Sequence, residues 1–243
     1  MSDSTEHTRN SKAETHRTYL KAMGIEVCLL KSNVKKIPDK VKNVTDHQAA
    51  NLSNKEKINS LSQAVSVCNK CNLHETRTQT VFGVGSIDSK CLFVGEGPGQ
   101  EEDRKGEPFV GRAGKLLDKM LTAIQLNRTK VYISNVVNYR PPANRKPTEV
   151  EIERYLPYLK SHIEIINPKI LMLLGSTALN TLIGNQVVIS KARGQWIQKE
   201  IGLAKPWIIA SFHPAFLMRQ PEQKKLAWID LKMVRDKSKI LKI

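Results

Sequence analysis

Three polar side chains in this sequence have the types needed for acid–base chemistry and for hydrogen bonds to a polar ligand. Glu96 lies in the glycine-rich segment from Gly95 to Gly99, where a carboxylate can act as a general base or orient a water molecule. The amide of Asn135 offers the donor and the acceptors that read the edge of a base. His213 can donate a hydrogen bond to a developing anion.

Two further segments could contact a planar ligand or nucleic acid. Phe109 lies between proline and glycine residues, outside any periodic core pattern, and could form a flat platform for a planar ring. The stretch from Ala215 to Arg219 is apolar and ends in a cation. Its Leu217 and Met218 could enter a duplex while Arg219 holds a phosphate.

Each of these features has a plainer explanation. The glycine segment could be a tight turn with an incidental glutamate, and Phe109 could simply cap the core. Asn135 could cap a turn through its own backbone, and His213 could be a satisfied structural residue. The stretch after His213 could be a short core helix, which alone would be the better interpretation.

The elements that must position these residues alternate between apolar runs and helical patterns. Short, continuous apolar runs are typical of parallel strands buried on both faces. Strands separated by helices predict an α/β fold with three layers and a central four-stranded parallel sheet. The expected strands are 91–94, 131–134, 170–174 and 207–210, and the expected helices are 59–67, 113–124, 149–166 and 176–183.

The candidate residues follow the ends of these expected strands. Ligands of open α/β sheets bind at the carboxyl ends of the strands. Gly95, Glu96, Gly97 and Gly99 follow the first strand, Asn135 follows the second, and His213 follows the fourth. We therefore expect the carboxylate, the amide and the imidazole to converge on one cleft, with the glycines allowing the backbone to approach a ligand.

Composition and charge narrow the class of protein. The chain has 243 residues, 40% of them hydrophobic, and a formal net charge of +16. It can build a core, and the excess of basic residues attracts polyanions such as nucleic acid. The longest apolar run, 170–174, is too short to cross a membrane, and the first residues lack the apolar part of a secretory signal. We expect a cytoplasmic protein without a membrane partner.

The chain divides into a tail and a domain. Residues 1–55 lack clear periodicity and are expected to be largely disordered or loosely helical. They carry ten basic and six acidic residues, so most of the excess positive charge belongs to residues 56–243, the expected folded domain.

Cys68 and Cys71 form a Cys-x-x-Cys pair that suggests a metal site. His74 extends the pattern, but neither Cys28 nor Cys91 supplies an obvious fourth ligand. A thioredoxin-like site is a weak interpretation, because the pair does not lead from a strand into a helix.

The motifs, taken in order, resemble the family 4 uracil-DNA glycosylases, which belong to the uracil-DNA glycosylase superfamily and carry an iron–sulfur cluster. The motifs are Gly-Glu-Gly-Pro-Gly from residue 95, Pro-Phe-Val-Gly-Arg-Ala-Gly from 108, Ser-Asn-Val-Val from 134 with Arg-Pro-Pro from 140, and His-Pro-Ala-Phe-Leu-Met-Arg from 213. The resemblance covers about residues 60–235. It implies a monomeric DNA repair enzyme that hydrolyses the N-glycosidic bond of deoxyuridine, leaving an abasic site.

The resemblance also assigns roles. Glu96 would position or activate the attacking water, and the backbone around the glycines would hold the extruded nucleotide. Phe109 would stack on uracil, and Asn135 would bind its pairing edge. His213 would donate to uracil O2, while Leu217, Met218 and Arg219 would support the distorted DNA.

One departure concerns the [4Fe–4S] cluster, which the family holds with four cysteines. The first two match Cys68 and Cys71, but the other two positions are Tyr139 and Tyr155. Because two thiolates cannot hold a cluster that needs four, we expect it to be absent or unstable, with the tyrosines filling its volume. The cleavage itself needs no metal.

Two other functions are weighed against this one. A nucleotide-binding hydrolase or transferase would need a phosphate loop or a second acidic magnesium ligand, and neither follows the expected strands. A DNA-binding or scaffold protein with a decayed glycosylase site gains weight from the lost cysteines. However, decay would not be expected to spare Glu96, Asn135 and His213 together.

Overall fold

A computed structural model of the chain describes residues 52–185 and 187–243. The expected tail therefore lies outside the described residues, apart from residues 52–55. These last residues start the first described helix, α2 (Asn54–Ser66), because the Ser53 side chain accepts a hydrogen bond from the Glu56 backbone and Glu56 bonds back to the Ser53 N–H. Helix α2 thus begins at Asn54, two residues before the expected start of the domain at residue 56.

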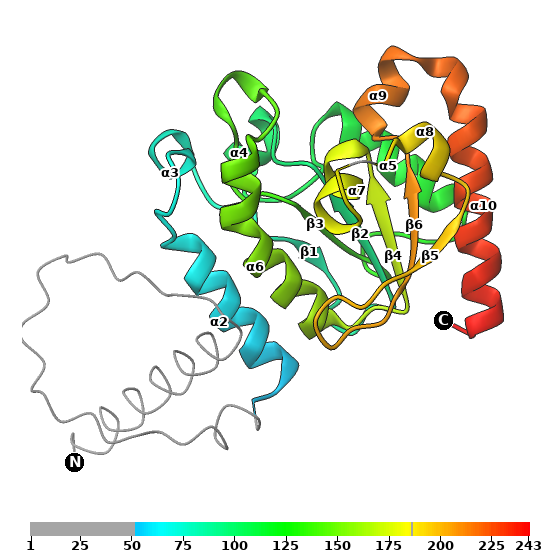
Figure 1. The fold of residues 1–243 in the computed structure, drawn as a ribbon, viewed down its shortest axis with the longest axis horizontal. Helices are drawn as coiled ribbons and strands as arrows, with labels where there is room; N and C mark the ends of the chain where they lie inside the picture. The colour runs from blue at the N-terminus through cyan, green and yellow to red at the C-terminus, as the bar shows by residue number, and fades with distance from the viewer. Residues whose placement is uncertain (1–51, 186) are drawn as a thin grey trace, which may run out of the picture.

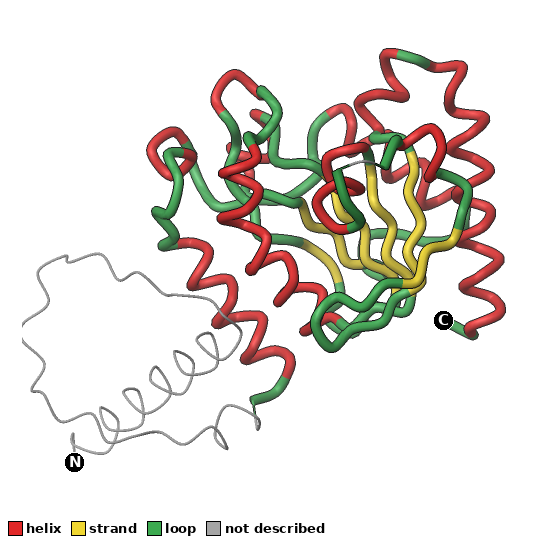
Figure 2. The backbone as a smooth tube through the Cα atoms, viewed as in Figure 1, coloured by secondary structure: helices red, strands yellow, loops and turns green. Residues whose placement is uncertain are grey.

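The described elements form three layers around one sheet (Figure 2). In chain order, after α2, they are α3 (Leu73–Thr76), β1 (Val84–Gly85), β2 (Cys91–Gly95), α4 (Gln100–Lys105), α5 (Arg112–Ala123), β3 (Tyr132–Asn135), the 3₁₀ turn η2 (Pro142–Asn144), α6 (Glu149–Ile166), β4 (Ile170–Leu174), α7 (Ser176–Leu182), α8 (Ile189–Ala192), β5 (Trp196–Gln198), β6 (Trp207–Ser211), α9 (Pro214–Arg219), η3 (Pro221–Gln223) and α10 (Lys224–Leu241).

The sheet has the strand order β1-β3-β2-β4-β6-β5. Its four central strands are parallel, as the sequence predicts. The prediction of four strands is wrong in number, because antiparallel β1 and β5 extend the sheet at its two edges. These edge strands have two and three residues and are incompletely buried, so they carry no continuous apolar run that could reveal them.

Side chains of the central strands alternate between two cores. Leu92, Val94 and Leu171 belong to a core on the face covered by α2, α6 and α7, while Phe93 and Met172 belong to a core on the face covered by α5, α9 and α10. Figure 1 shows α2 beside α6 on one side of the sheet and α10 on the other. Both faces are thus buried, as the unbroken apolar strands require.

The helices follow the sequence with small changes. α6 has the predicted bounds, and it begins with a second reciprocal cap between Thr148 and Glu151. α7 begins at Ser176, as predicted, with Gly175 at its N-cap position and no side-chain cap. α10 is an addition to the predicted helices. Among the residues that the structure describes, no helix combines the length and apolarity needed to cross a membrane.

Candidate active site

Four of the candidate side chains meet at one cavity at the carboxyl ends of the parallel strands. Glu96 follows β2, Asn135 ends β3, and His213 lies between β6 and α9, while Phe109 comes from the loop between α4 and α5. All four line a cavity of about 170 Å³. This volume is below the ~300–1,000 Å³ of pockets for drug-sized ligands, so the cavity suits a single small ring.

Gly95 is not in the lining of this cavity, but it leaves space beside two residues that are, Asn135 and Phe109. A Cβ atom at residue 95 would lie 2.5 Å from Asn135 Oδ1 and 2.5 Å from Cζ of Phe109, which is closer than side-chain atoms can pack. The amide oxygen of Asn135 is buried and has no hydrogen-bond partner. An unpaired buried acceptor costs about 1–3 kcal/mol, so its presence beside a cavity indicates a ligand that donates to it.

The backbone of Phe109 is held in a left-handed conformation, with φ of 55°. The Glu102 carboxylate accepts hydrogen bonds from the backbone N–H groups of Val110 (2.9 Å) and Gly111 (2.8 Å). Its other oxygen accepts from the Gly99 N–H (3.1 Å). Glu102 therefore ties the glycine loop that carries Glu96 to the loop that carries Phe109.

Arg128 holds the same loop from the other side. Its guanidinium donates to the carbonyl of Pro108 (2.9 Å) and to that of Phe109. It also pairs with Asp118 at 2.7 Å. These bonds fix a conformation that a phenylalanine rarely adopts, and such local strain is typical of positions that must present a side chain to a ligand.

The Glu96 carboxylate is oriented by a residue of the third strand end. The Thr177 hydroxyl, in the first turn of α7, donates a hydrogen bond to Glu96 Oε2. Glu96 also lines the cavity, so its carboxylate borders the space in which a ligand and a water molecule would lie. A carboxylate held in this way can accept a hydrogen bond from a water molecule in a fixed direction.

The His213 ring is fixed by its own helix. Its Nδ1 accepts a hydrogen bond from the Ala215 N–H at 3.1 Å and so caps α9. Burial, with a smaller contribution from Arg219, lowers the pKa of His213 to about 4. At neutral pH the imidazole is therefore uncharged, and because Nδ1 is an acceptor, the ring proton lies on Nε2 and can be donated.

The segment after His213 forms the short helix α9, the plainer of the two interpretations that the sequence allows. Leu217 is 1% exposed within the core under this helix. Leu217 therefore does not lie where DNA could contact it in this conformation. Met218 is half-buried and Arg219 is exposed, so these two remain at the surface near the cavity. The helical pattern of apolar residues explains the burial of Leu217.

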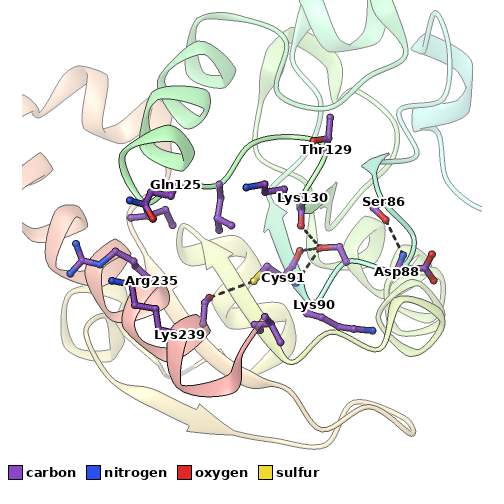
Figure 3. A pocket seen from close by; sticks show the side chains of 14 residues that line it. Ser86, Asp88, Lys90, Cys91, Gln125, Thr129, Lys130, Arg235 and Lys239 are labelled. Carbon is purple, nitrogen blue, oxygen red and sulfur yellow. Dashed lines mark hydrogen bonds between the residues drawn. The ribbon is translucent and has the colours of Figure 1, made fainter.

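A larger cavity, of about 500 Å³, lies at the opposite, amino ends of the parallel strands β2 and β3 (Figure 3). It is lined by residues just before β2 and β3 and by the last turns of α10, among them Lys90, Lys130, Arg235 and Lys239. None of the candidate residues reaches it. Since ligands of parallel sheets bind at the carboxyl ends of the strands, the smaller cavity is the stronger candidate site.

The residues at the expected cluster positions lie together but do not fit a [4Fe–4S] cluster. Cys68, Cys71, Tyr139 and Tyr155 share one core region, and both tyrosines are fully buried. Burial raises the pKa of the Cys71 thiol and raises that of Tyr139 to about 12. Within 52–185 and 187–243, no group of three or more His, Cys, Asp or Glu side chains is arranged to hold a metal. A cubane needs four thiolates, and the described part of the chain places two there, those of Cys68 and Cys71.

Three residues of the site were missed by sequence reasoning: Glu102, Arg128 and Thr177. Glu102 had a detectable signal, because it stands three residues after Gly99, the spacing of a helix cap. Its bonds to the Phe109 loop, and the contacts of Arg128 and Thr177, join segments far apart in the sequence and have no local signal.

Comparison with known proteins agrees with this geometry. The family model of the Uracil DNA glycosylase superfamily matches residues 82–232. The chain is 46% identical over 160 residues to the Type-4 uracil-DNA glycosylase of Thermotoga maritima, covering 65% of this chain and 82% of that protein. It is 39% identical over 183 residues to the Type-4 uracil-DNA glycosylase of Archaeoglobus fulgidus, covering 74% and 92%. A DNA polymerase of Bacillus phage SP01 is 31% identical over 163 residues, which are 17% of that polymerase.

Proposed function

The chain belongs to the uracil DNA glycosylase superfamily and to its type-4 enzymes, and from this premise we propose that it removes uracil from DNA. The reaction hydrolyses the N-glycosidic bond of deoxyuridine, releases uracil and leaves an abasic site. The observation that carries the proposal is the buried, unpartnered amide oxygen of Asn135 beside a cavity the size of one ring.

Uracil must leave the base stack to reach this cavity. Extrusion costs a few kcal/mol, which contacts in the pocket must offset. The Phe109 ring lines the cavity beside the amide of Asn135, so a flat base can stack on the ring while its edge meets the amide. The amide can accept from uracil N3–H and donate to O4, and the hydrogen bond to N3–H would satisfy the orphaned Oδ1 atom.

Glu96 and His213 then act on the two ends of the breaking bond. Glu96, oriented by Thr177, directs a water molecule at C1′ and accepts its proton. The oxygen of the water bonds to C1′ as the bond from C1′ to N1 breaks, and the electron pair leaves with the base. Neutral His213 donates from Nε2 to uracil O2, where negative charge accumulates. Every step uses side chains of this chain and requires no cofactor.

DNA binding is assigned to the surface beside α9 and to the glycine loop. Arg219 is exposed at the end of α9 and can hold a phosphate, while half-buried Met218 can contact the distorted duplex. The backbone at Gly97 and Gly99 borders the cavity and can hold the extruded nucleotide. All of these groups come from one chain, so we propose that the monomer is the active form.

The test is excision of uracil from a labelled oligonucleotide, followed by alkaline cleavage of the abasic site. Wild-type protein should cut at uracil and leave thymine and cytosine controls intact. Glu96→Gln should reduce the single-turnover rate by about 10²–10⁴-fold and His213→Gln by about 10²–10³-fold. Glu107→Gln is the matched control, because Glu107 is an exposed glutamate outside the cavity.

A folded wild-type protein that binds DNA but leaves uracil in place would contradict the proposal. That result would favour a DNA-binding protein with a decayed site. An equal loss in Glu107→Gln would show that the effect is not specific to the cavity.

A further inference from the structure

The loop from Cys68 to Arg77 is closed by protein groups alone. The Tyr139 hydroxyl donates to the carbonyl of Cys68 at 3.1 Å and to that of Val65. Val65 lies in the last turn of α2, where backbone carbonyls lack partners within the helix. One buried hydroxyl thus fixes both the end of α2 and the start of the Cys-x-x-Cys loop.

Arg77 closes the same loop at its other end. Its guanidinium donates to the carbonyl of Cys68 (3.1 Å) and to that of Ser66 (2.7 Å). Its central carbon lies 4.0 Å from the centre of the Tyr139 ring, in a cation–π contact. A cation at the end of a helix is also favoured by the helix dipole. Arg77 therefore ties residues 66–77 together without a metal.

Tyr155 belongs to α6 and extends into the core region that also contains Cys68 and Tyr139. Its ring packs edge-on against Tyr139, with 5.4 Å between centroids and an angle of 76°, and it lies 6.1 Å from the ring of Tyr158. Both Tyr139 and Tyr155 are fully buried, and they are the two largest fully buried side chains in the described part of the chain. Two rings therefore occupy the side of the pair Cys68 and Cys71 where two more thiolates would be needed.

We propose that Tyr139, Tyr155 and Arg77 form an aromatic lock that replaces the iron–sulfur cluster as the link between α2, the Cys68 loop and α6. The chain then folds and keeps its stability without iron, and Cys68 and Cys71 act as packing thiols. The inference rests on the proposed function in one respect: a cluster is expected at this position because the chain belongs to the type-4 enzymes.

The first experiment measures iron. Full-length protein is purified without oxygen, incubated with ferrous iron and sulfide, desalted, and assayed for iron and for cluster absorbance. We expect no stoichiometric iron in the wild type and cluster uptake by the double variant Tyr139→Cys/Tyr155→Cys. Adding Cys68→Ser and Cys71→Ser to the double variant should abolish the uptake.

A wild-type protein that holds stoichiometric iron would overturn the proposal. If Cys28→Ser then removed that iron, Cys28 would be identified as a further ligand. A single zinc ion bound by the wild type would equally overturn the proposal, because the thiols would then be ligands rather than packing groups.

The second experiment measures stability, so that the proposal does not depend on the double variant folding. Cys68→Ser/Cys71→Ser should lower Tm by only a few degrees. Tyr139→Phe keeps the ring but removes the donor to two carbonyls, and should lower Tm by about 2–6 °C. A collapse of the double serine variant with an unchanged Tyr139→Phe variant would contradict the lock.

Uracil excision is measured on the same samples, which separates this inference from the proposed function. Iron-free protein that excises uracil supports both. Iron-free, stable protein that leaves uracil in place supports the lock and contradicts the proposed function. Iron-bound protein contradicts the lock whatever its activity.

Discussion

Two regions of the molecule each contain a buried polar atom without a partner, and the two atoms differ in their surroundings. These are Asn135 Oδ1 and the Tyr155 hydroxyl, the two such side-chain atoms found among the described residues. Asn135 lines a cavity, and Gly95 leaves the space beside its Oδ1 atom free of a side chain. Tyr155 faces Tyr139 and the thiol region, and it lines neither of the two cavities described above.

This difference distinguishes a site with room for a ligand, beside Asn135, from a site already occupied by protein side chains, around Tyr155. In the cleft, the left-handed backbone of Phe109 and the unpartnered acceptor of Asn135 lie beside a cavity, and under the proposed function a bound base would use both. Around Tyr139 the polar groups are paired and the aromatic rings are packed, and the Tyr155 hydroxyl has no geometric hydrogen bond but lies close enough to the Cys71 thiol to interact with it. An orphaned polar atom therefore indicates function only where there is room for a partner.

The largest expected effect comes from filling the cleft. Gly95→Ala places a Cβ against Asn135 and Phe109, so we expect kcat/KM for uracil excision to fall by at least about 100-fold. Tm should change much less than activity, since Gly95 has no positive φ to lose. The measurement is single-turnover excision beside a thermal melt. Full activity in Gly95→Ala would show that the base does not bind in this cavity.

Removing the unpaired acceptor tests the comparison directly. Asn135→Ala deletes the hydrogen bonds to uracil, and we expect excision to fall by about 10–100-fold. Because the deleted oxygen has no partner in the protein, the free energy of unfolding should barely change. Chemical denaturation provides the measurement. A large loss of stability would mean that Asn135 supports the fold rather than the ligand.

The bond between Thr177 and Glu96 has a smaller expected effect. Thr177→Val keeps the shape of the side chain but removes the hydroxyl that donates to Glu96, so kcat should fall by about 5- to 10-fold with little change in KM. Thr177→Ser, which restores a hydroxyl, should recover most of the rate. A rise in KM at constant kcat would place Thr177 in DNA binding instead.

Two histidines, His213 in the cleft and the buried His162 of α6, determine an expected dependence of stability on pH. Burial lowers the pKa of His162, which bonds the Tyr132 hydroxyl, to about 3, and that of His213 to about 4. Unfolded histidine titrates near 6.5, so the unfolded chain binds more protons below that pH. The contribution of these two histidines to the free energy of unfolding should therefore be fully present above about pH 6.5 and should be lost as the pH falls toward 4. His162→Gln should make a profile of Tm against pH shallower, and an unchanged profile would show that His162 does not contribute.

The smallest expected effect lies in the filled region. Tyr155→Phe removes the orphaned hydroxyl and keeps the ring, so Tm should stay constant or rise by about 2–4 °C, and excision should be unchanged. A thermal melt and the excision assay check both parts. A clear fall in Tm would mean that the Tyr155 hydroxyl has a stabilising partner. The contrast drawn here between the two regions would then be wrong.

The sequence predicts what depends on periodicity and on strand ends. Helix α6 and strand β4 appear with the predicted bounds because long periodic and short apolar runs leave little choice. Glu96, Asn135 and His213 meet because parallel strands place their carboxyl ends together. Helix α10 could have been predicted from its buried residues, which recur at helical spacing: Ala227, Leu231, Val234 and Ser238.

Other features depend on contacts between distant segments and had no such signal. The short strands β1 and β5 form only because a neighbouring strand presents an open edge. Leu217 points inward because α9 packs on the core. The six residues of α9 alone do not show which side of the helix faces the core. The hydrogen bonds of Thr177 and Arg128 likewise exist only after the strand ends and loops have assembled.

The contact between Arg77 and the end of α2 has a consequence for how the enzyme matures. It joins residues nine and eleven positions apart, so it can form early, as soon as that stretch of chain is made. A cluster must instead be assembled and delivered after synthesis. With the aromatic lock, the supply of active repair enzyme would follow protein synthesis alone, independent of iron availability and of oxidants that destroy clusters.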